Sequence, residues 1–208
     1  MKFGPLLLVA LLTVGCGRSG STSAQTPAEA AQKAGELKTS TDPKVNPDAA
    51  AMADFKVRVD KYADLHKDLA KGSAKQKEDT DAQQIHAQKT ALVAKIQAAC
   101  ADAKPGDIFT PEISTAFRKL LKPEMKGEDG RDAKEILKDD APAPGTVAFK
   151  VNASYPENQP KPTMPMNLLL NLPTLPEPLE YRVVGRHLLL LDTAADVIVD
   201  YILNVITT

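Results

Sequence analysis

The sequence predicts an α+β fold: a long helical hairpin and short helices, followed by a small antiparallel β module. Three observations predict this class. Apolar residues recur at alternating spacings of three and four over residues 52–103, the period of amphipathic helices. After Gly145 the apolar residues alternate with a period of two, as in a half-buried strand. Three short runs of leucine and β-branched residues then lie between turn residues over 179–202.

Residues 1–15 have the order of a targeting signal. Lys2 precedes an apolar run over residues 6–12, and Gly15 leads directly to Cys16. The run is much shorter than the roughly 20 residues needed to cross a bilayer, which favours a removable segment. The order resembles the signal peptide and lipobox of bacterial lipoproteins. The resemblance implies that Cys16 is acylated and becomes the new N-terminus.

The position three before the cysteine holds Thr13, where the lipobox usually has leucine. Two alternatives therefore stay open, an uncleaved signal anchor and a plain secretory peptide cut near Gly20 or Ala24. Gly17 after the cysteine, in place of aspartate, is similar to lipoproteins sent on to the outer membrane. The resemblance thus implies a lipid-anchored protein of the bacterial cell envelope, on the periplasmic face of the outer membrane.

Residues 16–48 are predicted to form a disordered tether behind the lipidated cysteine. The segment is rich in Ser, Thr, Ala, Gly, Pro and Lys and has almost no large apolar residue, so it cannot build a core. A coil of this length would let the folded part move roughly 30 Å from the membrane.

Residues 49–104 are predicted to form the helical hairpin. Gly72 and Ser73 break the pattern in the middle, and Pro105 and Gly106 end it. The second helix, if it takes up about 30 residues, would reach roughly 45 Å and would protrude as a coiled-coil arm. The residues predicted to form the seam between the two helices are Phe55, Val59, Tyr62, Ile85, Leu92 and Ile96.

Short helices are predicted over residues 105–140. Thr110 can cap a helix that starts at Pro111, and Pro123 is predicted to end it. Residues 127–130 are predicted to form a turn, and 131–138 one more short helix.

Residues 141–208 are predicted to form a proline-rich arm and an antiparallel β meander that pack with the helices. A strand is predicted over 147–155, and the prolines after it allow at most a helical turn around 167–170. The meander has strands over 179–184, 187–191 and 197–202, with its first turn at Gly185. A final helix capped by Thr193 is the alternative, and strand is preferred because the last run consists of β-formers.

The C-terminal half carries a second resemblance. The segments 151–157, 168–176 and 179–187, with Asp192 and 198–200, resemble a group of exported bacterial proteins labelled only as hypothetical. The similarity covers about the last hundred residues. No activity is assigned to that group, so the resemblance implies an envelope location and supplies no functional residue.

No catalytic, metal-binding or cofactor-binding set is predicted. His66 and His86 lie on the two long helices, and apart from Asp64 and Asp81, which are expected to face solvent, no Cys, Asp or Glu is spaced to complete a metal site. The acidic residues at 128–140 lack the spacing of a calcium loop. Cys100 is expected to act as a small hydrophobe, with a reactive thiol or a bridge between chains as the alternatives.

Two classes of function remain. The chain has 26 Lys and Arg against 27 Asp and Glu and no basic stripe, which argues against nucleic-acid binding. The favoured class is a non-catalytic scaffold or interaction protein, anchored in the membrane by its lipid, with an envelope protein as its partner. The alternative is a ligand-binding or hydrolytic domain with a site between the sheet and the helices of 111–138, using Arg182, Arg186, His187 and Asp192.

Overall fold

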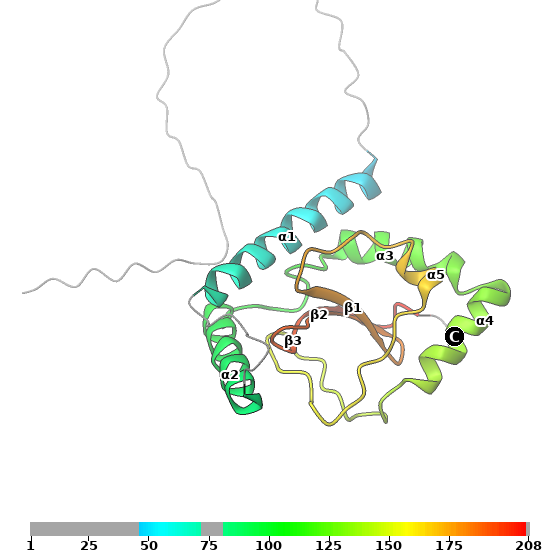
Figure 1. Ribbon diagram of the computed structural model, residues 1–208. Helices are drawn as coiled ribbons and strands as arrows, with labels where there is room; N and C mark the ends of the chain where they lie inside the picture. Colours follow the sequence, from blue (N-terminus) through cyan, green and yellow to red (C-terminus); the bar gives the residue numbers. More distant parts are fainter. Residues whose placement is uncertain (1–45, 72–80, 207–208) are drawn as a thin grey trace, which may run out of the picture. The chain divides into compact units, whose positions relative to one another are not determined.

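A computed structural model describes residues 46–71 and 81–206, which all belong to one compact unit, Pro43–Thr208. Predictions for Cys16, the tether up to residue 45 and the break at Gly72 lie outside the described residues. The described elements are α1 (Pro47–Ala70), α2 (Ala82–Ala99), α3 (Pro111–Glu124), α4 (Gly127–Asp139), α5 (Met166–Leu169), β1 (Leu179–Val184), β2 (His187–Asp192) and β3 (Val197–Ile202) (Figure 1). The predicted α+β class is confirmed.

The three strands form an antiparallel sheet in the order β1-β2-β3. Leu179 pairs with Asp192 at one end of the first hairpin, and Val184 pairs with His187 at the other. Gly185 takes a φ of 61° in the tight turn between them, a backbone region that favours glycine. The predicted meander is confirmed, and its last run is a strand, as preferred over the helix.

The sheet is covered on both faces. On one face α1, α3 and α5 pack over the sheet, with Phe55 stacked on Phe109 at 5.6 Å and edge-on to Phe117 at 4.9 Å between ring centroids. On the other face Val147 and Tyr155, from the segment that runs beneath the sheet in Figure 1, pack against β1, β2 and β3. Leucines 188–191 of β2 are therefore fully buried on both sides.

The prediction that the apolar faces of the two long helices pack against each other is wrong. Phe55, Val59 and Tyr62 do form one buried stripe of α1, but the stripe packs in the core with α3 and the sheet. Ile85, predicted to face them, is 39% exposed. A helix face next to a hydrophobic sheet buries more apolar surface there than along a second narrow helix, which explains the difference.

The predicted long protruding arm is also wrong. α2 has 18 residues and ends at Ala99, so it reaches roughly 27 Å. Ile96 is buried and packs with Ala195 and Val197 at the edge of the sheet, so α2 lies against the sheet. Asn152 holds the end of the helix, because its side-chain amide donates to the carbonyl oxygens of Gln97 and Cys100, both at 2.9 Å.

The strand predicted over 147–155 does not form. Asn152 takes a φ of 61°, which interrupts an extended chain, and the segment keeps a single bridge to β3, between Ser154 and Val197. Its alternation is nevertheless used, because Val147, Val151 and Tyr155 are buried. The alternation of apolar residues there reflects an irregular segment that buries one of its sides, not a strand.

The turn predicted over 127–130 is the first turn of α4, which begins at Gly127 and is longer than predicted. A Cβ on Gly130 would lie 2.3 Å from the carbonyl carbon of Met125, so glycine permits this close approach. α3 begins as predicted, with Thr110 accepting from the backbone of Ile113, but continues through Pro123 to Glu124.

Candidate functional site

Three buried aspartates mark the end of β2, the turn after it and the middle of β3. Asp192 and Asp200 are fully buried, and Asp196 is 5% exposed. Carboxylates are expensive to bury without partners, so their partners decide whether they serve chemistry or the fold. The region around them is the candidate site.

Asp192 ties α1 to the sheet. Its Oδ2 accepts from the Tyr62 hydroxyl at 2.9 Å and lies 2.6 Å from Nδ1 of His66. Its Oδ1 accepts from the backbone N–H groups of Ala194 and Ala195, at 3.1 and 2.9 Å. Burial, followed by the charge of Asp192, raises the pKa of Tyr62 far above its usual range, so the hydroxyl stays a donor. We call Tyr62, His66 and Asp192 the α1 clasp.

A carboxylate that holds a histidine is also a feature of catalytic triads. In the α1 clasp the side chain of Asp192 is fully buried and that of His66 is 11% exposed. Both carboxylate oxygens of Asp192 already accept hydrogen bonds from protein donors. Neither residue lines the cavity beside Asp196. The geometry is that of a structural tie between a helix and a turn.

Asp200 holds the loop before α3. Its Oδ2 accepts hydrogen bonds from the backbone N–H groups of Ile108 at 2.9 Å and Phe109 at 2.8 Å. Both of its oxygens also accept from the backbone N–H of Gly106. Phe109 in turn stacks on Phe55 in the core between the sheet and helices α1 and α3. The carboxylate thus supplies the acceptor for these buried loop N–H groups, and it holds the loop that leads into α3.

Asp196 lies between two cations from different segments. It pairs with Lys89 of α2 and, at 2.5 Å, with Lys161 of the proline-rich arm. Burial by itself raises the pKa of Asp196, but the hydrogen bonds from Lys161 and Lys89 outweigh it and leave that pKa below its ordinary value. The ion pair therefore joins α2 and the arm to the β2–β3 turn.

We expect Asp196→Asn to destabilise the protein by about 1–2 kcal/mol at pH 7. This loss is smaller than the loss of a fully buried ion pair would be, because both lysines are partly exposed. The pKa of the folded state lies below that of the unfolded chain. The stabilisation is therefore complete above roughly pH 4 and is lost as the pH falls through the folded pKa.

Urea unfolding at pH 7 and pH 2.5 checks this expectation. The difference between the parent and Asp196→Asn should shrink at the lower pH. Asp60→Asn, which removes an exposed pair with Lys56, is the matched control and should change little at either pH. An equal loss at both pH values would contradict the ionic account of Asp196.

A cavity of about 160 Å³ lies beside Asp196. The residues that line it come from α2, the 154–157 segment and the β2–β3 turn: Lys89, Thr90, Val93, Ser154, Tyr155, Glu157, Ala195 and Asp196. The predicted alternative placed a site elsewhere, between the sheet and the helices of 111–138. That space is filled by the aromatic cluster of Phe55, Phe109, Phe117 and Tyr181.

The structure does not bring together the four residues of the predicted alternative site. His187 begins β2 and Asp192 ends it, which separates them by roughly 17 Å. Arg182 binds Glu180 and the carbonyl of Pro162, and Arg186 donates to the carbonyl of Ile206. Burial and then the charge of Arg186 lower the pKa of His187, whose Nδ1 accepts from the backbone of Asn204.

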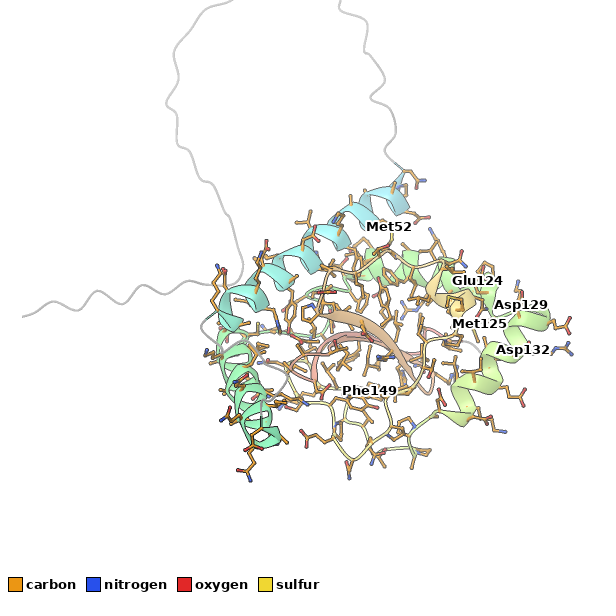
Figure 2. The ribbon with its side chains drawn as sticks, in the orientation of Figure 1. Met52, Glu124, Met125, Asp129, Asp132 and Phe149 are labelled. Carbon is orange, nitrogen blue, oxygen red and sulfur yellow. The ribbon has the colours of Figure 1, made fainter. Side chains whose placement is uncertain are left out.

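The other candidate ligands are spread over the surface or the fold. His86 is exposed on α2, whereas His66 belongs to the α1 clasp. Glu128, Asp129, Asp132 and Glu135 are exposed on α4, and Figure 2 shows Asp129 and Asp132 at the outer side of that helix. Within residues 46–71 and 81–206, no group of three His, Cys, Asp or Glu side chains could hold a metal ion.

Sequence reasoning missed the roles of Tyr62, Asp196 and Asp200. A signal was present, because Asp192 and Asp200 interrupt or end strongly apolar runs at a spacing of eight residues, with Asp196 midway. An acid within such a run must be buried with partners or must end the strand. Nothing local identified the distant partners, Tyr62 and His66 for Asp192 and the loop 106–109 for Asp200, which lie 91 to 130 residues away in sequence.

Comparison with known proteins supplies no relative: no family model, no curated protein and no solved structure matches this chain. Among the helices of the described part, none is long and apolar enough to cross a membrane.

Proposed function

We propose that this chain is a lipid-anchored protein of the bacterial cell envelope and that its folded unit is a non-catalytic interaction domain. The observation that carries the location is the apolar run over 6–12 followed by Gly15 and Cys16. Acylation at Cys16 and a position on the periplasmic face of the outer membrane complete the proposal.

The arrangement of the buried acids supports a non-catalytic role. Asp192 and Asp200 each accept backbone hydrogen bonds, and Asp196 is shared between two lysines. A catalytic carboxylate instead needs an oxygen atom that is free to reach the substrate. The ligand-binding or hydrolytic alternative has less support, since its four residues lie apart and the sheet–helix space is filled with aromatic rings.

Cys16→Ala tests the proposal in a two-membrane bacterium that expresses the full chain. We expect the parent chain to fractionate with outer membranes after a salt wash and Cys16→Ala to be lost from them, because several acyl chains hold a protein firmly. The matched control is Cys100→Ala, which removes the other cysteine and should leave fractionation unchanged.

Retention of Cys16→Ala in salt-washed membranes would place the anchor elsewhere and refute the lipid-anchor proposal. Loss of both cysteine variants would point to a folding defect, which the circular dichroism of each purified chain distinguishes.

A further inference from the structure

The short helix α5 presents a patch of exposed apolar side chains. Leu170 is 76% exposed, Met166 66% and Leu169 41%, and all three lie within one helical turn or directly after it. Single exposed apolar residues are ordinary on a protein surface, whereas a contiguous patch of large apolar side chains is a candidate contact site. We call Met166, Leu169 and Leu170 the α5 patch.

The core holds α5 in place. Leu168 is fully buried and Leu172 is 8% exposed, and both pack in the core that α1 and α3 form with the sheet. The side-chain amide of Asn167 donates to the carbonyl of Glu124 at 3.0 Å, and Figure 2 shows Glu124 and Met125 beside α5. The α5 patch therefore lies on a helical turn that Leu168, Leu172 and Asn167 hold against the core.

The patch lies in an uncharged stretch of a chain in which 25% of all residues are charged: no residue between Lys161 and Glu177 carries a charge. Charged side chains are strongly disfavoured in hydrocarbon, so such a stretch is suited to the boundary of a bilayer. Three side chains cover far less than the roughly 800 Å² per partner that a stable protein interface buries. Their area suits shallow insertion into lipid better than a second copy of the chain.

The first described residues of the chain, at the start of α1, lie near the patch. Lys119 of α3 pairs with Asp48, in the first turn of α1, at 2.7 Å. Glu124, which holds α5, lies five residues further along α3, or roughly 7.5 Å. A tethered site also needs little affinity of its own, because a short linker supplies an effective concentration on the order of millimolar.

We infer that the α5 patch inserts into the interfacial layer of the bilayer that holds the lipid anchor. The inference rests on the proposed function, since without the anchor the patch is too small to bind a membrane by itself. With the anchor, the two contacts hold the folded unit against the lipid in one orientation, with α5 toward the bilayer.

Fluorescence quenching tests this inference on the full lipidated chain in phosphatidylcholine vesicles. Leu170→Cys, in a Cys100→Ala background, carries an environment-sensitive dye, and the vesicles contain a lipid with a nitroxide near its head group. We expect the label at 170 to lose most of its fluorescence. The matched control is Val57→Cys, which is 65% exposed on α1 and should keep its fluorescence.

Two further measurements make the outcomes distinct. Adding Met166→Ser and Leu169→Ser should restore most of the fluorescence at 170, while vesicle flotation stays unchanged. A chain that floats with the vesicles but shows no quenching at 170, or equal quenching at 57 and 170, overturns the inference and leaves the lipid anchor standing. A full chain that carries no lipid and does not float overturns the proposed function itself.

Discussion

Asp200→Ala is expected to lower the free energy of unfolding by about 3–5 kcal/mol. The change removes the acceptor of the backbone N–H groups of Ile108 and Phe109 and leaves them buried without a partner, which costs about 1–3 kcal/mol each. Phe109 also stacks in the aromatic core, so movement of the loop would disturb packing as well. Urea denaturation followed by circular dichroism measures the loss.

Asp200→Asn separates hydrogen bonding from the effect of volume. Its single carbonyl oxygen can keep the bonds to Ile108 and Phe109, but its amide then faces the N–H of Tyr201, which donates to Oδ1 in the parent chain. We expect an intermediate loss of about 2 kcal/mol. Full stability in Asp200→Ala would show that the loop before α3 does not depend on the carboxylate.

Asp192→Ala is expected to cost a similar amount, about 3–5 kcal/mol, because it opens the α1 clasp. Tyr62 and His66 lose their common acceptor, and the N–H groups of Ala194 and Ala195 are left unsatisfied. The melting temperature and urea midpoint of the purified chain measure the effect.

Asp192→Asn should cost much less, about 1 kcal/mol. Asparagine can accept from Ala194 and Ala195 with its oxygen and donate with its amide to the Tyr62 hydroxyl or to a neutral His66. A stably folded Asp192→Asn or His187→Ala chain should also keep its cellular role. Loss of that role at unchanged stability would contradict the non-catalytic proposal and would move the search to a site around β2.

The helical stripe of α1 and the meander could be predicted because their information is local. Phe55, Val59 and Tyr62 follow the helical period, and Gly185 follows turn chemistry. The partner of the stripe could not be predicted, because periodicity shows which face is buried and not what covers it. α3 and the sheet covered it, while α2 took the edge beside Val197.

The irregular parts show where a local pattern misleads. The alternation over 147–155 predicts a strand, but the left-handed backbone of Asn152, whose side chain holds the end of α2, prevents a ladder. The α1 clasp depends on Tyr62 and Asp192, 130 residues apart in sequence. A single sequence gives no signal for such a pair, although it does mark Asp192 as an acid beside a buried run.

We propose that the mature chain begins at an acylated Cys16. Mass spectrometry of the N-terminal peptide, from full-length protein purified from the membranes of a two-membrane bacterium, checks this start. We expect a peptide that starts at Cys16 and carries the mass of the lipid. An unmodified peptide that starts near Gly20 or Ala24, or an intact segment 1–15, would contradict it.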